Sequence, residues 1–100
     1  WMKVQNYLSD ASTVINATSL GMEVKAELPI PLQGLKKNTL VTDIVYTPLN
    51  TPLLENAAKR GCRTVDGLGM LIHQAIPGFE RWFGVKPDVS EKLRELLISQ

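Results

Sequence analysis

The stretch LVTDIVYTPLNTP, residues 40–52, decides the fold. Its first seven residues, 40–46, form a run rich in β-branched side chains, which is typical of a strand. The next four residues contain a proline and an asparagine and indicate a loop. A helix should follow, because Thr51 can accept hydrogen bonds from the free amides of a first turn and Pro52 suits the first helical position. A strand that passes through a loop into a helix is a building unit of parallel sheets.

The same alternation continues on both sides of this stretch. We expect a helix over residues 51–60, ended by Gly61 in a left-handed conformation. Residues 13–17 form a short β-branched strand upstream, and residues 63–66 form a third strand downstream. Residues 22–39 contain prolines and a glycine without a sustained period, so they indicate a connection with at most local helix.

Two further helices are expected after the third strand. The pattern predicts one over about residues 67–83, and its apolar stripe should be buried. That stripe consists of Leu68, Ile72, Ala75, Ile76, Phe79 and Phe83. Pro77 and Gly78 should interrupt and kink this helix, because proline lacks an amide N–H and its ring clashes with the carbonyl four residues back. The last helix is expected over about residues 90–99, with Ser90 as its cap.

This order of elements predicts an α/β fold with about three parallel strands, flanking helices and a C-terminal helix. Three strands are too few for a complete doubly wound sheet. Neither an internal repeat nor a flexible linker indicates a second domain within residues 1–100. A chain that begins with Trp1 also argues against a natural start, so we expect further strands upstream of these residues.

Composition and charge exclude several classes of function. The formal net charge is +1, and no basic patch of the kind that binds nucleic acid is present. No apolar run is long enough to span a membrane, and the first residues lack the pattern of a signal peptide. The single cysteine, Cys62, cannot form an intrachain disulfide and has no companions at metal-ligand spacing. These features favour a cytoplasmic protein without a metal site.

Polar residues gather where the expected strands end, which is where ligands bind to open parallel sheets. They are Asn16 and Thr18 after the first strand, Tyr46 after the second, and Asp66 and Gly67 after the third. From Gly67, helical spacing carries Met70 and Gln74 along the same side. The sequence therefore predicts a binding site along this rim.

Taken singly, these residues also have ordinary structural explanations. Asn16 and Thr18 are common turn residues. Tyr46 could be a strand aromatic with its hydroxyl at the surface, and Met70 could fill a core. His73 lacks an acidic or cysteine neighbour at triad spacing, so a surface or packing role is favoured.

Four motifs in a fixed order connect these separate observations. They are VINATSLGM at residues 14–22, DIVY at 43–46, TPLL at 51–54 and DGLGMLIHQA at 66–75. In this order they resemble the shikimate dehydrogenase family, and the similarity runs from about residue 13 to residue 85. The resemblance implies a Rossmann-like NADP-binding domain, of which residues 1–100 would be the C-terminal part. It also implies the reversible reduction of 3-dehydroshikimate to shikimate with NADPH, on the route to chorismate and the aromatic amino acids.

The resemblance assigns a role to each candidate residue. It implies cofactor binding by Asn16, Ala17, Thr18, Ile44, Gly67 and Met70, and substrate binding by Tyr46 and Gln74. The family's catalytic lysine and aspartate and its glycine-rich phosphate loop have no counterpart in these residues. No catalytic residue is therefore assigned, and the chain alone is expected to be inactive. Two alternatives stay open: a quinate and shikimate dehydrogenase with broader cofactor use, and a stand-alone interaction module without catalysis.

The first strand has a further consequence for association. In the complete sheet, the strand around Val14 and Ile15 should pair with a strand that precedes these residues. Its edge is then expected to be bare in this chain, and bare edges invite pairing with another chain. We predict self-association or strand exchange between copies.

Overall fold

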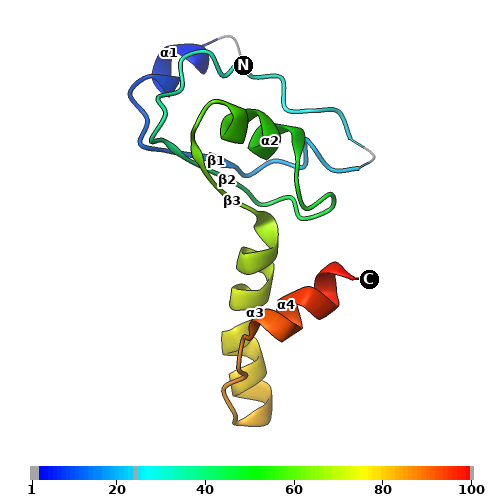
Figure 1. The fold of residues 1–100 in the computed structure, drawn as a ribbon. Helices are drawn as coiled ribbons and strands as arrows, with labels where there is room; N and C mark the ends of the chain where they lie inside the picture. Colours follow the sequence, from blue (N-terminus) through cyan, green and yellow to red (C-terminus); the bar gives the residue numbers. More distant parts are fainter. Residues whose placement is uncertain (1–2, 24, 100) are drawn as a thin grey trace. The chain divides into compact units, whose positions relative to one another are not determined.

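The computed structural model describes residues 3–23 and 25–99. Its elements are, in order, α1 (Gln5–Leu8), β1 (Thr13–Asn16), β2 (Leu40–Asp43), α2 (Pro52–Lys59), β3 (Arg63–Val65), α3 (Gly67–Phe83) and α4 (Glu91–Ile98) (Figure 1). The chain divides into two compact units, of which the first ends at Gly67 and the second begins at Leu68. The first unit holds the three strands with α1 and α2, and the second holds α4 and nearly all of α3.

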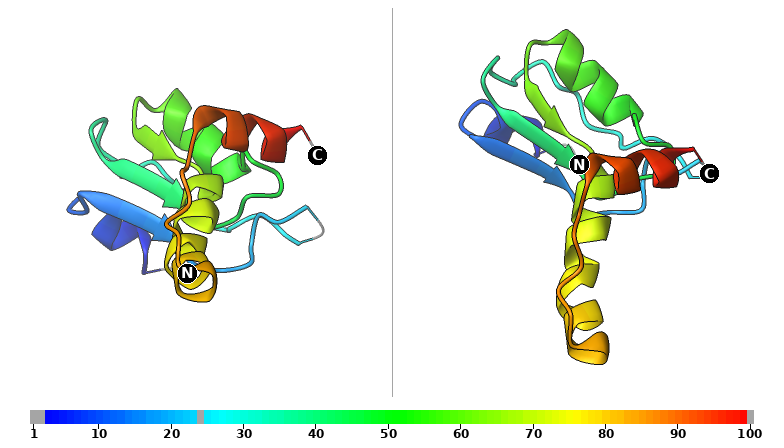
Figure 2. Two further views of the ribbon diagram at one scale, coloured as in Figure 1. Left: turned by 90° about the horizontal axis from the view of Figure 1, so that it is seen from below. Right: turned by 60° about the horizontal axis from the view of Figure 1, so that its bottom comes forward.

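A parallel sheet with the strand order β1-β2-β3 forms the centre of the first unit. The register of β1 and β2 places Asn16 beside Asp43, and that of β2 and β3 places Leu40 beside Arg63. The three strand arrows run in the same direction in both views of Figure 2, and α2 packs on β2 and β3. The predicted α/β class, with three parallel strands and flanking helices, is confirmed.

The local signals around α2 are also confirmed. Thr51 precedes the helix in an extended conformation, and its hydroxyl accepts a hydrogen bond from the amide of Leu54 at 3.4 Å. Pro52 is the first residue of the helix. Gly61 follows the helix with φ +84°, a conformation that glycine adopts without steric cost. A threonine cap of this kind contributes about 1 kcal/mol.

The core of the first unit combines the sheet, α2 and the long connection between β1 and β2. It consists of Leu8, Leu35, Val41, Leu53, Leu54, Ala57 and Cys62. The described residues of the connection, 17–39, form neither helix nor strand, yet Leu35 is buried and Leu28 and Leu32 pack against the core. Prolines disfavour a helix here, so irregular chain supplies the apolar cover that a crossover helix usually gives. Cys62 is a small residue of this core and is 8% exposed.

All three strands end earlier than the sequence predicts, and β3, predicted over residues 63–66, stops at Val65. The strands predicted over residues 13–17 and 40–46 stop at Asn16 and Asp43. The amide of Thr18 donates to Asn16 Oδ1 at 3.1 Å, and the amide of Val45 donates to Asp43 Oδ1 at 3.0 Å. Side chains of this type turn the backbone by binding the amide two residues on. β1 and β2 therefore end because the last side chain of each strand forms a local turn.

The helices of the second unit have close to the predicted bounds. Ser90 caps α4, because its hydroxyl accepts a hydrogen bond from the amide of Leu93 at 3.2 Å. The expected interruption of α3 at Pro77 and Gly78 is wrong, because the helix continues through both residues to Phe83. Proline removes one backbone amide donor from the helix. The other hydrogen bonds of this helix of 17 residues are enough to keep it continuous.

The prediction that the whole apolar stripe of α3 is buried is also wrong. Leu68 and Ile72 are buried, but Phe79 is 41% exposed and Phe83 is 65% exposed. These two rings stand 4.7 Å apart and contact each other along the helix. Two helices offer each other too little surface to cover such a stripe, and α4 contains no buried residue.

In the described part of the chain, no helix is both long and apolar enough to cross a membrane.

Candidate functional site

A groove of about 290 Å³ lies in the first unit, beyond the carboxyl ends of β1 and β2. Its walls are Ala17, Thr18, Ser19 and Met22 from the loop after β1, and Ile44, Val45, Tyr46 and Thr47 from the loop after β2. Ligands of open parallel sheets bind at this edge. The structure thus brings four predicted site residues together in one groove: Ala17, Thr18, Ile44 and Tyr46.

The hydroxyl of Thr18 is already engaged within its loop. It donates a hydrogen bond to Asn16 Oδ1 at 2.7 Å and accepts one from the amide of Leu20 at 3.1 Å. A hydroxyl has one hydrogen to donate and two lone pairs. Thr18 can therefore offer a ligand an acceptor position and its methyl group, but its hydroxyl hydrogen is in use.

Asn16 lies behind the groove and does not line it. The side chain is 3% exposed, and its Oδ1 accepts from both the amide and the hydroxyl of Thr18. Its Nδ2 donates to the carbonyl of Leu20 at 2.9 Å and to Asp43 Oδ1 at 3.0 Å. A carboxamide has two hydrogens to donate, and both are used here. The side chain of Asn16 therefore supports the loop that forms one wall of the groove.

Gly67 lies against the wall that the loop after β2 forms. A Cβ atom at this position would stand 2.5 Å from the carbonyl oxygen of Ile44 and 2.7 Å from that of Val45. These contacts are with backbone atoms, which cannot turn aside as a flexible side chain can. Gly67 is therefore required for the close approach of the start of α3 to the loop after β2.

Met70 and Gln74 belong to the second unit, and neither is a lining residue of the groove. Met70 is 53% exposed. The Nε2 of Gln74 donates to the carbonyl of Leu71 at 3.0 Å. Gln74 also lines a separate cavity of about 400 Å³ whose other walls are apolar residues of α3, α4 and the segment between them. The structure gives these two residues a common helix face, as their spacing predicted.

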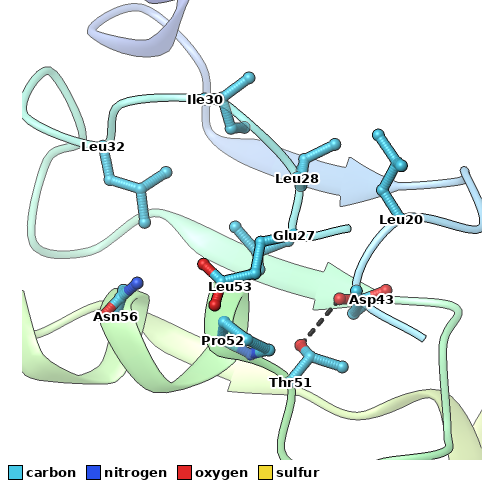
Figure 3. Close-up of a pocket in the computed structure, with 11 residues that line it drawn as sticks. Leu20, Glu27, Leu28, Ile30, Leu32, Asp43, Thr51, Pro52, Leu53 and Asn56 are labelled. Atoms are coloured by element: carbon cyan, nitrogen blue, oxygen red, sulfur yellow. Dashed lines mark hydrogen bonds between the residues drawn. The ribbon is translucent and has the colours of Figure 1, made fainter. Parts of the chain in front are cut away.

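Sequence patterns did not single out six residues of this region as site residues: Ser19, Met22, Val45 and Thr47, which line the groove, and the buried pair Asp43 and Thr51. Asp43 is 1% exposed and Thr51 is fully buried, and the hydroxyl of Thr51 donates to Asp43 Oδ2 at 2.8 Å (Figure 3). Both side chains border a cavity of about 30 Å³ beside α2. A signal was available, because an acidic residue in a strand of β-branched residues has to find hydrogen-bond donors when it is buried.

Comparison with known proteins identifies the same family as the motifs. The family model described as the shikimate 5'-dehydrogenase C-terminal domain matches residues 67–97. A curated relative from Paracoccus denitrificans, named shikimate dehydrogenase (NADP(+)), is 58% identical over 99 residues. That alignment covers 99% of this chain and 35% of the relative, so the chain spans about a third of the length of the relatives it matches.

Solved structures agree with this comparison. The quinate dehydrogenase of Corynebacterium glutamicum, solved in complex with NAD, has a TM-score of 0.88 and 36% identity, over 99% of this chain and 35% of that one. The shikimate 5-dehydrogenase of Thermus thermophilus, solved with NADP(H) and shikimate, has a TM-score of 0.76 and 32% identity, over 84% of this chain and 32% of that one. The chain therefore belongs to the shikimate dehydrogenase family and corresponds to the C-terminal part of its members.

Proposed function

We propose that this chain is the C-terminal part of an NADP-dependent shikimate dehydrogenase, which reversibly reduces 3-dehydroshikimate to shikimate on the route to chorismate. The observation that carries the proposal is the 58% identity over 99 residues with a relative of that name. The groove supports it, because it combines residues from two strand ends at the edge of the sheet where nucleotides bind. The catalytic lysine and aspartate of the family are expected outside these residues.

The groove is suited to a flat ring of low polarity. Ala17 and Ile44 come from opposite walls, and Val45 adds a further apolar surface. We propose that Ala17, Thr18 and Ile44 contact the nicotinamide end of NADP, that Gly67 and Met70 contact it from α3, and that Asn16 acts through its loop. The bound cofactor would supply or accept the hydride, while these residues hold its ring in place.

Tyr46 and Gln74 are the proposed substrate ligands. Tyr46 lines the groove and is 47% exposed, so its hydroxyl can reach a ligand. Gln74 carries an exposed carboxamide on α3. Phenol and carboxamide groups can both donate to and accept from the hydroxyl and carboxylate groups of shikimate.

The proposal can be tested in a chimaera in which this chain replaces the aligned 99 residues of the Paracoccus denitrificans relative. Dinucleotide reduction is followed at 340 nm with shikimate or quinate and with NADP⁺ or NAD⁺. We expect activity with shikimate and NADP⁺, and none from the chain alone. Activity only with quinate or NAD⁺ would contradict the proposed substrate or cofactor. A folded chimaera without any activity would favour an interaction module.

Tyr46→Phe tests the substrate contact within the same chimaera. The change removes one hydroxyl and keeps the ring, so KM for shikimate should rise about tenfold, as expected for the loss of a hydrogen bond to a polar substrate. Tyr7→Phe is the matched control, because Tyr7 is 71% exposed and is not a lining residue of the groove. Equal KM values for the two variants would remove Tyr46 from the site.

We further propose that copies of this chain associate through the edge of β1. This strand is at one end of the sheet order, and Ile15 within it is 59% exposed. An exposed apolar edge can pair with another strand. Sedimentation of the chain at increasing concentration should show dimers or larger species, and a strictly monomeric profile at high concentration would contradict the idea.

A cytoplasmic location is the last part of the proposal. Cys62 is a free thiol buried in the core, so residues 1–100 contain no disulfide that an oxidising compartment would have to maintain. Fractionation of cells that express the full-length protein should recover it with cytoplasmic markers. Recovery with an exported fraction would exclude this location.

A further inference from the structure

Asp43 is a buried acidic residue to which the proposed reaction assigns no role. It is 1% exposed and is the last residue of β2. Its carboxylate accepts three hydrogen bonds: from Asn16 Nδ2 at 3.0 Å, from the amide of Val45 at 3.0 Å and from the hydroxyl of Thr51 at 2.8 Å. A buried carboxylate is tolerated only when donors surround it in this way.

The first of these bonds joins two turns of the same kind, and the second closes one of them. Asn16 and Asp43 are register partners at the ends of β1 and β2. Each side chain binds the amide two residues further on, which belongs to Thr18 in one strand and to Val45 in the other. Because Asn16 also donates to Asp43, the two turns are held to each other as well as to their own strands.

The two turns lead directly into the walls of the groove. One wall begins at Ala17, immediately after Asn16, and the other begins at Ile44, immediately after Asp43. The third bond, from Thr51, fixes the residue that caps α2, to which the second loop leads. In Figure 3 a dashed line joins the carboxylate of Asp43 to the hydroxyl of Thr51, the residue just before that helix. One carboxylate therefore restrains both walls.

We propose that Asp43 is a positioning residue, which sets the spacing of the two loops and so the fit of the nicotinamide end of the dinucleotide. The inference rests on the proposed function, because it concerns the same groove. Asp43 acts through Asn16, Val45 and Thr51 and does not itself line the groove. Small errors in the placement of a reacting group are costly, since a shift of about 1 Å can reduce a rate about a hundredfold.

Two substitutions at this position separate geometry from charge. Asp43→Ala removes all three bonds, so the loops lose their common anchor. Asp43→Asn keeps two bonds and reverses the third: the amide oxygen can accept from Asn16 and Val45, and the amide nitrogen donates to the hydroxyl of Thr51, which donates in the parent. Thr39→Val is the matched control. Thr39 is 3% exposed near the opposite end of the same strand, and its hydroxyl donates to the carbonyl of Ala11 at 3.4 Å.

The variants are made in the chimaera and compared in three measurements: NADPH binding by its fluorescence, kcat/KM for NADP⁺ with shikimate, and the thermal unfolding midpoint. For Asp43→Ala we expect NADPH binding to weaken and kcat/KM to fall, each at least about tenfold. Asp43→Asn should stay within about threefold of the parent chimaera. Thr39→Val should lower the unfolding midpoint without changing NADPH binding or kcat/KM for NADP⁺.

Several results would overturn the inference. Unchanged NADPH binding in folded Asp43→Ala would limit the residue to stability, and an equal loss in Thr39→Val would show a general effect of destabilisation. An Asp43→Asn variant as weak as Asp43→Ala would show that the charge matters instead of the geometry. If Asp43→Ala does not fold, Asn16→Ala is measured in its place, because it breaks the bond between the two turns. Unchanged NADPH binding in Asn16→Ala would equally overturn the inference. An inactive parent chimaera that still binds NADPH would instead contradict the proposed reaction.

Discussion

The two compact units of this chain differ in how they satisfy their own sequence patterns. The first unit buries seven apolar residues in a core of its own, and its buried polar groups at the ends of β1 and β2 bind one another. In the second unit, Leu68 and Ile72 are the buried apolar residues among those described, and α4 buries none. Amphipathic helices become stable mainly through packing of their apolar faces. The first unit thus supplies its own packing partners, whereas the apolar faces of α3 and α4 need more surface than the second unit offers.

The largest expected difference between the units comes from leucine truncation. Leu54 is 3% exposed in the core of the first unit, so Leu54→Ala should lower the free energy of unfolding by about 3 kcal/mol. Leu96 on α4 is 55% exposed, so Leu96→Ala should change the free energy of unfolding by less than about 0.5 kcal/mol. Urea unfolding of the chain, followed by circular dichroism, measures both. Equal losses would show that α4 is packed in solution and would remove the contrast.

Two glycines at the start of α3 sharpen the comparison at the point where the units meet in the sequence. Gly67→Ala should cost about 2 kcal/mol, because its new Cβ would stand 2.5 Å from the carbonyl oxygen of Ile44. Gly69 has no such neighbour within 4 Å, so Gly69→Ala should be neutral or gain up to about 1 kcal/mol from helix propensity. The urea unfolding midpoints of the two variants measure this difference. A Gly67→Ala protein as stable as the parent would mean that the loop after β2 can move away from the new Cβ atom at little cost in free energy.

The features that the sequence predicts well are those with local causes. Thr51, Pro52 and Gly61 mark the ends of α2 through their own backbone preferences, and the structure confirms all three. The bond between Asn16 and Asp43 has no local cause, since the residues are 27 positions apart and meet only through the strand register. For the same reason four lining residues of the groove were missed. The early ends of β1 and β2 have a local cause in the turns of Asn16 and Asp43, which the runs of β-branched residues around them concealed. Thr18 and Tyr46 were found because they follow the ends of expected strands, and Ala17 and Ile44 only through the resemblance to the family.

Pro77 allows a smaller effect to be measured inside the second unit. Pro77→Ala restores the missing amide donor of α3, and the gain is partly offset because alanine leaves the unfolded chain more freedom. We expect a net gain of about 1 kcal/mol, with more helical ellipticity at 222 nm. Pro29→Ala in the irregular connection is the control, where only the offsetting effect applies and stability should fall by about 0.5 kcal/mol. A less stable Pro77→Ala variant would mean that the proline ring itself is packed.

The smallest expected effect concerns the exposed ion pair of α2. Lys59 Nζ stands 3.4 Å from Glu55 Oε1, with 71% and 53% of the two side chains exposed. A double-mutant cycle with Lys59→Met and Glu55→Gln should give a coupling of about 0.3 kcal/mol, and 1 M salt should remove it. A coupling above about 1 kcal/mol that survives salt would place surface charge among the main sources of stability of the first unit. The expected coupling is about ten times smaller than the cost of truncating Leu54, which lies on the same helix. The ion pair and Leu54 lie on one helix and differ in burial. A large cost at Leu54 beside a small coupling in the ion pair would therefore show that the core stabilises the first unit.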